Sequence, residues 1–338
     1  MHQRPPFSRG AALLAGPLLA SCLAGYDPCF VPPSVVPANL LRILAVRSDP
    51  PDLIVDLEQS GEVVLQIRAL VVSNSGATLR GRLCAPTTDK RCSPDLPLQA
   101  GPATPPDFDP TLELHVPLEL IRAARDQDPL KGYGGIQVLL DLEAVDDRGS
   151  ATASKTLLFF PREKAPAPNQ PIEVERIDFT SDGTRIASGA RYQAVGLEVA
   201  KAYGLRPRLA PPPGQPDGTS PLEWFDVTDL SGRTVHLREQ VAYSFFATPQ
   251  YLFGDLQGAG QVPVGVYLPG ADLGDEPAEG VPEPANGLVR FNPIKNGIGR
   301  VWVVARESRG AVAWLAVDVG AEDNRHCGPC PTLFFGCE

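Results

Sequence analysis

The sequence predicts an all-β protein built from two tandem β-sandwich domains. Short runs rich in β-branched residues and leucine recur along the chain, separated by clusters of Pro, Gly, Asp and Ser. The 338 residues include 37 prolines and 32 glycines, which favour turns and short strands over long helices. The two halves of the chain also begin and end with similar patterns, which indicates a duplicated unit.

The first 22 residues form a leader that predicts export. Arg4 and Arg9 precede an apolar stretch, residues 11–20, and small residues follow it, as in a secretory signal. One interpretation is an ordinary signal peptide that is cut after a small residue. The motif Leu-Ala-Ser-Cys, which ends at Cys22, resembles instead the lipobox of bacterial lipoproteins, in which the cysteine is the first mature residue.

This resemblance implies that residues 1–21 are a lipoprotein signal peptide and that Cys22 carries a lipid anchor. Three acyl chains on this cysteine are enough to hold a protein on a bilayer, whereas a single chain binds only marginally. Leu23 stands where an aspartate would indicate retention in the inner membrane, so the outer membrane is favoured. Both the periplasmic face and the outer face are compatible with the motif.

Residues 22–40 are rich in proline and glycine and are predicted to form an extended tether. A first sandwich is predicted over residues 41–163. In it, residues 63–72 alternate between apolar and polar positions, which is typical of a half-buried strand. Only Leu118–Arg125, after Pro117, has the pattern of a helix.

The proline-rich stretch 164–171 (KAPAPNQP) predicts a linker between the two sandwiches. The strand pattern then resumes, and a second sandwich is predicted over residues 172–320. Residues 321–338 contain three cysteines and are predicted to form a separate C-terminal tail.

Both sandwiches are predicted to end in a hairpin with an acidic-x-Arg-Gly turn. The turns are Asp146-Asp147-Arg148-Gly149 in the first half and Glu307-Ser308-Arg309-Gly310 in the second. A glycine at the fourth position suits a type I turn followed by a left-handed residue, which closes a hairpin. A chance likeness between two hairpins is the alternative to a duplication.

The pattern of about seven short strands in each half resembles the immunoglobulin-like modules of bacterial surface lipoproteins. The resemblance implies two immunoglobulin-like sandwiches and extends to envelope lipoproteins of high-GC Gram-negative bacteria. The Cys…Trp…Cys arrangement of antibody domains is missing from the sequence. Trp302 and Trp314 lie instead on the two strands of the last hairpin, where we expect them to pack in the core.

If Cys22 is lipidated, six of the seven cysteines are left, which is typical of a disulfide set in an exported chain. Cys84 and Cys92 bracket a short loop and predict a local bridge. We expect one of the three tail cysteines to pair with Cys29 and the other two to pair with each other. The six candidates are Cys29, Cys84, Cys92, Cys327, Cys330 and Cys337.

The tail contains Cys327-Gly328-Pro329-Cys330, which resembles the dithiol motif of thioredoxins. In that family the motif opens a helix, whose amino terminus stabilises the attacking thiolate. Only eight residues follow Cys330, so we interpret the motif as part of a disulfide knot. A redox site and a metal site formed by His326 with the three tail cysteines are the alternatives.

Composition and motifs argue against several classes of function. The chain has a net charge of −10, and removal of the leader leaves 28 basic against 40 acidic side chains, a net charge of −12, so nucleic acid is not a predicted partner. No nucleophile elbow, zinc-binding His pair or phosphate loop occurs. His115 and His236 lie in strands and are predicted to be structural. We therefore predict neither an enzyme nor a cofactor.

Two later loops are candidate binding elements. Residues 251–268 carry aromatic and apolar side chains among glycines, a pattern that favours a hairpin of the second core over a carbohydrate-binding loop. Residues 272–283 carry five carboxylates with no basic residue among them. This pattern favours a solvated acidic loop, and calcium binding is the alternative.

Taken together, these patterns predict an envelope lipoprotein with a structural or binding role. Its predicted partners are the membrane, through the lipid anchor, and a protein or glycan of the envelope. The alternative is an envelope thiol oxidoreductase, or another enzyme, that uses Cys327 and Cys330.

Overall fold

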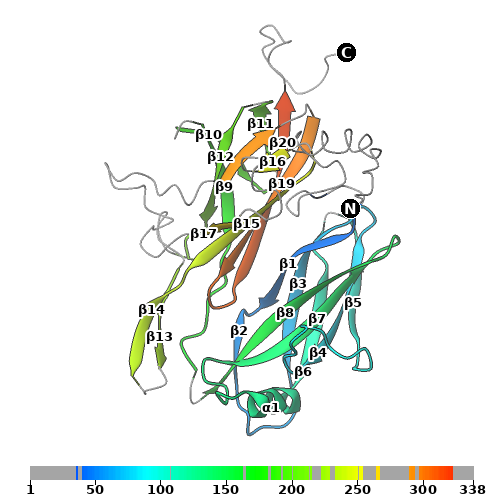
Figure 1. Ribbon diagram of the computed structural model, residues 1–338, viewed down its shortest axis with the longest axis vertical. Helices are drawn as coiled ribbons and strands as arrows, with labels where there is room; N and C mark the ends of the chain where they lie inside the picture. The colour runs from blue at the N-terminus through cyan, green and yellow to red at the C-terminus, as the bar shows by residue number, and fades with distance from the viewer. Residues whose placement is uncertain are drawn as a thin grey trace, which may run out of the picture.

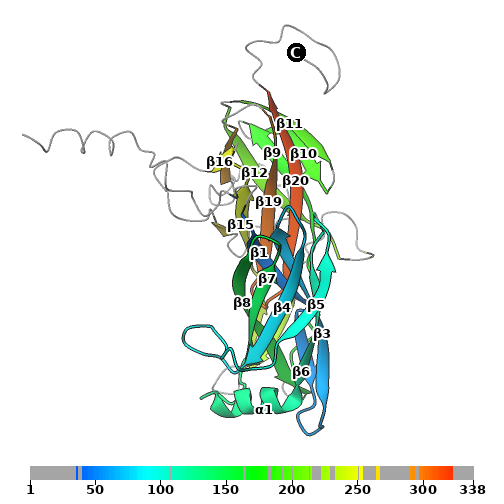
Figure 2. The ribbon, with the colours of Figure 1, turned by 90° about the vertical axis from the view of Figure 1, so that its right-hand side faces the viewer.

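The computed structural model places two β-rich halves end to end (Figure 1). A short helix, α1, lies at the free end of the first half, which Figure 2 shows from the side. The structure describes residues 36, 40–106, 108–162, 165–181, 184–191, 193–199, 201–212, 214, 222–228, 233–249, 251–253, 264–266, 289–293 and 297–322.

The first half is a sandwich of two sheets around one apolar core. One sheet has the strand order β1-β3-β6 and the other β2-β8-β7-β4-β5. Every second residue of β4 is buried, because alternate side chains of a strand point to opposite faces of the sheet. The strands are β1 (Arg42–Asp49), β2 (Asp52–Val55), β3 (Glu62–Val72), β4 (Ala77–Cys84), β5 (Gln99–Thr104), β6 (Thr111–Pro117), β7 (Ile136–Val145) and β8 (Ser150–Pro161).

The helix predicted after Pro117 is confirmed as α1 (Leu118–Gln127). Leu118, Ile121 and Ala124 are buried at a spacing of three residues, so one face of the helix covers the core. On the other side of the helix, Arg122 donates hydrogen bonds of 2.8 Å to the carbonyl oxygens of Leu57 and Gln59. The helix therefore closes the end of the first sandwich and is tied to the chain beside it.

The described residues of the second half form two five-stranded sheets, of order β10-β9-β12-β18-β16 and β11-β20-β19-β15-β17. A third, two-stranded sheet is formed by the hairpin β13–β14. The strands are β9 (Val174–Ser181), β10 (Thr184–Ala190), β11 (Ala194–Glu198), β12 (Tyr203–Leu209), β13 (Trp224–Thr228), β14 (Thr234–Arg238), β15 (Val241–Ala247), β16 (Tyr251–Phe253), β17 (Val264–Val266), β18 (Val289–Pro293), β19 (Gly297–Glu307) and β20 (Val312–Glu322).

The larger sheets of the two halves share one connectivity. An early strand pairs parallel with the last strand of its half, as β2 does with β8 and β11 with β20. The last strand then pairs antiparallel with its hairpin partner, in β7–β8 and β19–β20. The prediction of an all-β fold of sandwiches, each half ending in a hairpin, is confirmed.

The prediction of a hairpin over residues 251–268 is wrong. β16 pairs with β18 in one sheet of the second half, whereas β17 pairs with β15 in the other. The segment thus passes from one sheet to the other, because each of its short apolar runs finds a longer strand to pair with. Local pattern alone does not distinguish these two arrangements.

Each half has its own buried cluster, and a third cluster joins them. The members of the first cluster are buried apolar residues between Val55 and Phe159, and those of the second lie between Ile172 and Ala321. Within the described residues, no sheet takes strands from both sides of the stretch 165–171. No helix among those residues is long and apolar enough to cross a membrane.

Candidate functional site: the junction between the two halves

Strand β1 lies between the two halves and contacts both. Ile43 and Val46 pack against the core of the first half, whereas Leu44 faces the second half. There it belongs to the same buried cluster as Trp302 and Val304, which lie on the outer face of β19. We call this contact the apolar junction; its buried residues are Val36, Leu44, Ala45, Leu70, Phe246, Trp302, Val304 and Trp314.

Val36 extends the apolar junction toward the amino terminus. It lies in the segment predicted as an extended tether, but its side chain is fully buried. Its backbone N–H donates a 2.8 Å hydrogen bond to the carbonyl oxygen of Ala247, at the end of β15. The chain is therefore attached to the second half before it enters the first strand of the first half.

Polar side chains border the apolar junction. The guanidinium of Arg42 lies 5.8 Å from the ring centroid of Phe246, and that of Arg47 lies 5.4 Å from Trp314. Arg306 donates to the carbonyl oxygen of Leu44 at 3.2 Å. These contacts add cation–π attraction and a charged hydrogen bond to the buried apolar area.

The expectation that Trp302 and Trp314 pack in a core is correct, but the core is a different one. Both side chains leave the sandwich on its outer face and are covered by the first half. The indole N–H of Trp314 donates to a carboxylate oxygen of Asp109, in the first half, at 3.1 Å. The two tryptophans thus join the halves rather than fill the second sandwich.

A second contact between the halves is polar and centres on Arg309. Its side chain is 7% exposed, and it donates to carboxylate oxygens of Asp52 at 3.2 Å and of Glu239 at 3.3 Å. It also donates to the carbonyl oxygen of Ala167, in the segment between the halves, at 2.5 Å. We call this contact the ionic junction; it consists of Asp52, Asn169, Glu239, Glu307 and Arg309.

Asn169 and Glu307 complete the ionic junction. The backbone N–H of Asn169 donates to Asp52 at 3.2 Å, and its side-chain amide donates to Glu307 at 3.0 Å. The other oxygen of Glu307 accepts from the Ser308 hydroxyl at 3.0 Å and from the backbone N–H of Arg309. One residue of the first half, one of the linking segment and three of the second half therefore share a single hydrogen-bonded network.

Burial places more negative than positive charge in the ionic junction. Asp52, Glu239 and Glu307 are buried; Asp52 and Glu239 pair with the Arg309 guanidinium, whereas Glu307 accepts from the Arg309 backbone N–H. Burial raises the pKa of Glu239 to about 7, and the charges of Glu307 and Glu223 act in the same direction. The Glu223 backbone N–H and Arg309 oppose this shift. Glu239 therefore changes its charge near neutral pH.

Lys155 places a second titrating group near the same turn. Burial, with a contribution from Arg306, lowers the pKa of Lys155 to about 8. Its ammonium lies 3.5 Å from the carbonyl oxygen of Gly310, in the turn between β19 and β20. The backbone of that turn is left-handed at Gly310, where φ is +106°, as the sequence predicts for the fourth turn position.

The arrangement is suited to joining the two halves. The donors of Arg309 face carboxylates and a carbonyl, and each buried carboxylate accepts from named donors. Among the described residues, no group of three or more His, Cys, Asp or Glu side chains is placed to hold a metal ion. The sequence marked Arg309 only as a turn residue, and no local pattern indicates its partners.

The hairpin β13–β14 starts from the ionic junction and projects away from the sandwiches (Figure 1). Glu223 and Glu239 flank it, and each backbone N–H of the pair donates to the other residue at 2.9 Å. Phe225, on one face of the hairpin, lies 4.9 Å from the guanidinium of Arg309. The root of the hairpin is therefore held by the same arginine that joins the two halves.

The opposite face of the hairpin carries an exposed aromatic pair. Trp224 is 58% exposed, and its ring stacks on His236 with centroids 4.9 Å apart and an interplanar angle of 5°. An oxygen of Asp226 lies 2.7 Å from Nδ1 of the same imidazole ring. His236 was predicted to be a structural histidine at the surface or in the core; it lies on the surface, where it stacks on Trp224.

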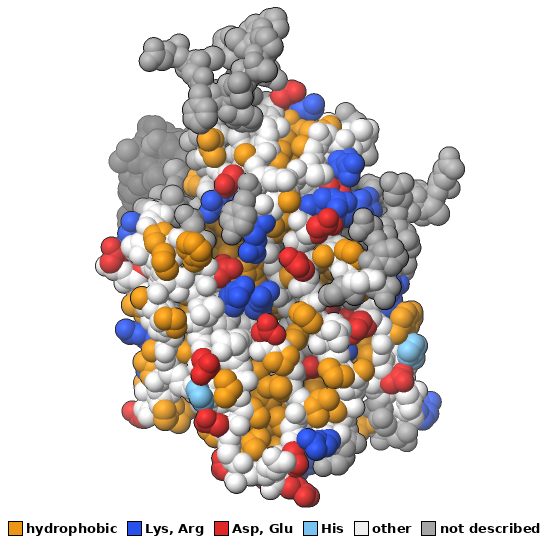
Figure 3. All heavy atoms as spheres, turned by 180° about the vertical axis from the view of Figure 1, so that it is seen from behind, with side chains coloured by type: hydrophobic (Ala, Val, Ile, Leu, Met, Phe, Trp, Pro, Cys, Tyr) orange, Lys and Arg blue, Asp and Glu red, His pale blue; other side chains and the backbone are white. Residues whose placement is uncertain are grey.

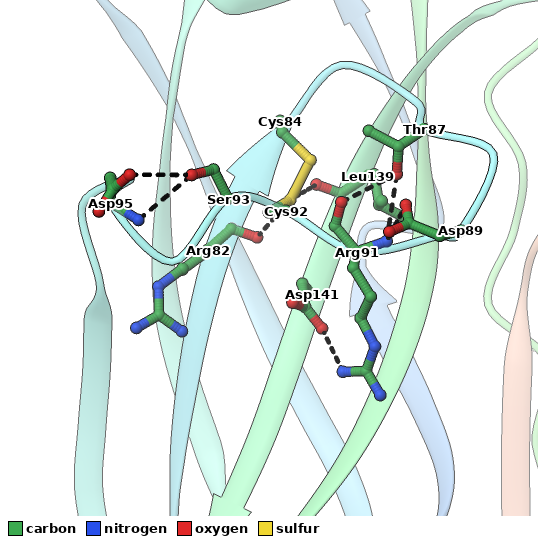
Figure 4. Close-up of a disulfide and its surroundings, with 10 residues drawn as sticks. All are labelled: Arg82, Cys84, Thr87, Asp89, Arg91, Cys92, Ser93, Asp95, Leu139 and Asp141. Carbon is green, nitrogen blue, oxygen red and sulfur yellow. Dashed lines mark hydrogen bonds and ion pairs between the residues drawn. A yellow bond between two sulfur atoms is a disulfide. The ribbon is translucent and has the colours of Figure 1, made fainter.

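The predicted bridge between Cys84 and Cys92 is confirmed (Figure 4). It closes the loop that leaves β4, with the two Cα atoms 5.7 Å apart. Thr87 exchanges hydrogen bonds with the backbone of Arg91, and the Arg91 side chain pairs with Asp141 at 2.9 Å. The loop is thus held by a covalent bond, by its own turn and by a contact to β7.

His115 lies on the surface of β6, as expected for a structural histidine. It contacts Glu62 at 2.7 Å and Glu113 at 3.3 Å, and the hydrogen bond to Glu62 raises its pKa. The remaining predicted site residues lie outside the described residues. They are Cys22, Cys29, His326, Cys327, Cys330, Cys337 and the acidic segment 272–283.

No protein-family model matches the sequence, and no curated protein matches it. Three solved structures illustrate the similarity found among known folds. A transglutaminase of red sea bream aligns with 83% of this chain and 31% of its own, at 8% identity and a TM-score of 0.24.

The fibronectin(III)-like modules of CbhA from Clostridium thermocellum align with 86% of this chain and 100% of their own, at 9% identity and a TM-score of 0.21. The adhesin InvE of Yersinia pseudotuberculosis aligns with 81% of this chain and 58% of its own, at 12% identity and a TM-score of 0.20. At these scores the alignments do not establish a shared arrangement of the two halves.

Proposed function

We propose that this protein is a lipid-anchored component of the bacterial cell envelope with a non-enzymatic role. In this role the two sandwiches form one rigid body, which presents the hairpin β13–β14 to a protein or glycan partner. The observation that carries the proposal is the ionic junction, in which Arg309 contacts the first half, the linking segment and the root of the hairpin.

The anchor part of the proposal rests on the leader sequence. The basic start, the apolar stretch and the four residues that end at Cys22 match the order of a lipoprotein signal. A triacylated Cys22 would bind stably to the outer membrane. Val36 is buried between the halves, so about 13 residues would connect the lipid to the folded body.

The display part of the proposal rests on the rigidity of the junction. Domains joined by a linker alone move freely, unless their interface is large and apolar. Here the apolar junction buries two tryptophans and the ionic junction ties the linking segment to both halves. A projecting hairpin on such a body keeps a fixed direction, which lowers the entropy lost on binding.

The exposed face of the hairpin supports a binding role. Tryptophan is enriched at protein contacts and stacks on sugar rings, and Trp224 is exposed on a strand that its neighbours hold in place. The stacked His236 limits the rotamers of the indole ring. We therefore place the contact with the partner on Trp224, His236 and the edge of β13.

The anchor is tested by replacing Cys22 with alanine in the producing bacterium. We expect the wild-type protein to fractionate with the outer membrane and Cys22→Ala to be released into the soluble fraction. A matched control is Ser21→Ala, which keeps a small residue before the cysteine. Unchanged membrane fractionation of Cys22→Ala contradicts the anchor.

The display role is tested by measuring which cell-envelope material, separated into protein and glycan fractions, the purified protein retains. Retention of one fraction by the wild-type protein should fall at least about tenfold in Trp224→Ala. Val64→Ala, another exposed apolar position but in the first half, is the matched control. Equal retention by all three proteins excludes the hairpin as the contact surface.

A further inference from the structure

Three arginines from both halves converge beside the apolar junction. Arg47 lies on β1, Arg68 on β3, and Arg191 between β10 and β11. We call them the arginine patch. Figure 3 shows that basic side chains gather near the middle of one face of the molecule, whereas hydrophobic side chains gather below them, over the first half.

Arg47 and Arg68 are direct cross-strand partners in the antiparallel pair β1–β3. Residues opposed in this way share one face of the sheet, with Cβ atoms about 4.5–5.5 Å apart. Their face is the one turned toward the second half, because Arg47 lies over Trp314. Like charges in this position repel each other and destabilise the pair.

Arg191 brings a third positive charge from the second half. The charges of Arg68 and Arg191 both lower the pKa of Arg47, after the larger effect of burial. Burial raises the pKa of Asp109, whereas the charges of all three arginines lower it. Asp109 is therefore within electrostatic reach of the whole patch. Arg47 and Arg68 are neighbours across β1–β3, and Arg191, from a distant segment of the chain, lies within electrostatic reach of Arg47 and Asp109.

The patch has more guanidinium donors than nearby acceptors. Within the part of the chain that the structure describes, no hydrogen bond or ion pair joins Arg47, Arg68 or Arg191 to a carboxylate. Asp49 and Asp109 are the carboxylates whose charges act on Arg47. Asp109 already accepts the indole N–H of Trp314. Each guanidinium has five N–H donors, and Arg68 and Arg191 are exposed, so donors of the patch are accessible to a ligand in solution.

We propose that the arginine patch is a binding site for an anionic oxygen group, a phosphate, that bridges the two halves. Guanidinium forks match the geometry of phosphate oxygens and bind them through paired, charge-assisted hydrogen bonds. A bound phosphate would also relieve the repulsion between Arg47 and Arg68. This site goes beyond the display role, since it lies on the body of the protein and does not require the hairpin.

The proposal is tested by calorimetric titration of the purified protein with inorganic phosphate at constant ionic strength. Glycerol phosphate, titrated in parallel, represents the same group in a lipid headgroup. We expect saturable binding of at least one of the two, and roughly tenfold weaker binding after Arg68→Gln, which removes charged hydrogen bonds. Arg191→Gln should weaken binding to a similar extent.

Arg80→Gln is the matched control, because Arg80 lies on β4 in the opposite sheet of the first half. It should leave the affinity unchanged. Binding of inorganic phosphate alone identifies a free anion as the ligand, and tighter binding of glycerol phosphate identifies a phosphoester. The proposal is overturned if neither ligand gives saturable heat, or if Arg68→Gln and Arg80→Gln bind as the wild type does.

Discussion

The apolar junction and the ionic junction hold the same two halves together by different physical means. The apolar junction buries Trp302 and Trp314 and draws on the removal of apolar area from water, which is non-directional and insensitive to pH. The ionic junction arranges three carboxylates around Arg309, so it depends on direction, protonation and the presence of every member. We therefore expect the apolar junction to supply most of the stability and the ionic junction to set the orientation of the halves.

Removal of the Trp302 side chain should break the apolar junction and lower the free energy of unfolding more than removal of Arg309 or of the disulfide. Trp302→Ala leaves a cavity between the halves and should lower the free energy of unfolding by about 4 kcal/mol. Urea denaturation at pH 5 and at pH 8 should show the same loss, because no ionisable group is removed. The exposed Trp224, changed to alanine, is the control and should change stability by less than about 0.5 kcal/mol.

Removal of Arg309 should break the ionic junction with a loss of about 3 kcal/mol, since buried carboxylates remain without their cation. Unlike that of Trp302→Ala, this loss should shrink as the pH falls and the carboxylates take up protons. Arg300→Ala, which breaks the surface ion pair with Asp318, is the matched control and should cost about 0.5 kcal/mol. A pH-independent loss in Arg309→Ala would contradict the distinction between the junctions.

The bridge between Cys84 and Cys92 lies away from both junctions. Its removal therefore tests the stability of the first half separately from the contact between the halves. Replacement of both cysteines by serine should lower stability by about 2–3 kcal/mol, through the greater freedom of the unfolded chain. Combined with Trp302→Ala, its effect should be additive, because the two sites share no contact. A clear departure from additivity would show that the loop contributes to the junction.

Glu239→Gln should change the free energy of unfolding least, but it should change how that free energy depends on pH. The pKa of Glu239 is raised to about 7, above the usual 4.5, so the folded state keeps a proton that the unfolded state has lost. This contribution to stability is fully present below about pH 4.5 and is lost as the pH rises to about 7.

Glutamine cannot ionise, so the variant should lack this decline. At pH 8 it should be about 2 kcal/mol more stable, relative to its stability at pH 5, than the wild type. Measurement of unfolding by urea across pH 4–8 checks this difference. Glu143→Gln, on β7, is the control and should follow the wild-type profile.

Several elements were predictable because their causes are local. Residues 136–145 form the strand that their apolar run predicts, and α1 begins directly after Pro117. In β3, Leu65, Ile67 and Ala69 are buried as the alternation predicts. The Cys84–Cys92 bridge was predictable because only seven residues separate its ends. In each case the partners lie within a few residues or follow a simple period.

The candidate site was not predictable in the same way. Arg309 contacts Asp52, which lies 257 positions earlier, and Arg306 contacts Leu44 across 262 positions. The pattern of β19 shows apolar residues on both faces but does not indicate what covers the outer one. The segment 251–268 failed as a hairpin for the same reason, since its short strands pair with strands distant in the chain.

The sequence by itself therefore determined the all-β class, the terminal hairpin of each half, the helix and the short disulfide loop. These features follow from period, turn chemistry and short separation along the chain. Only the tertiary structure decided that Trp302 and Trp314 join the halves, that Arg309 holds the linking segment and the hairpin, and that three arginines meet beside them. The physical reason is that the outer face of a sheet acquires its partner from a distant part of the chain, and periodicity carries no information about that partner.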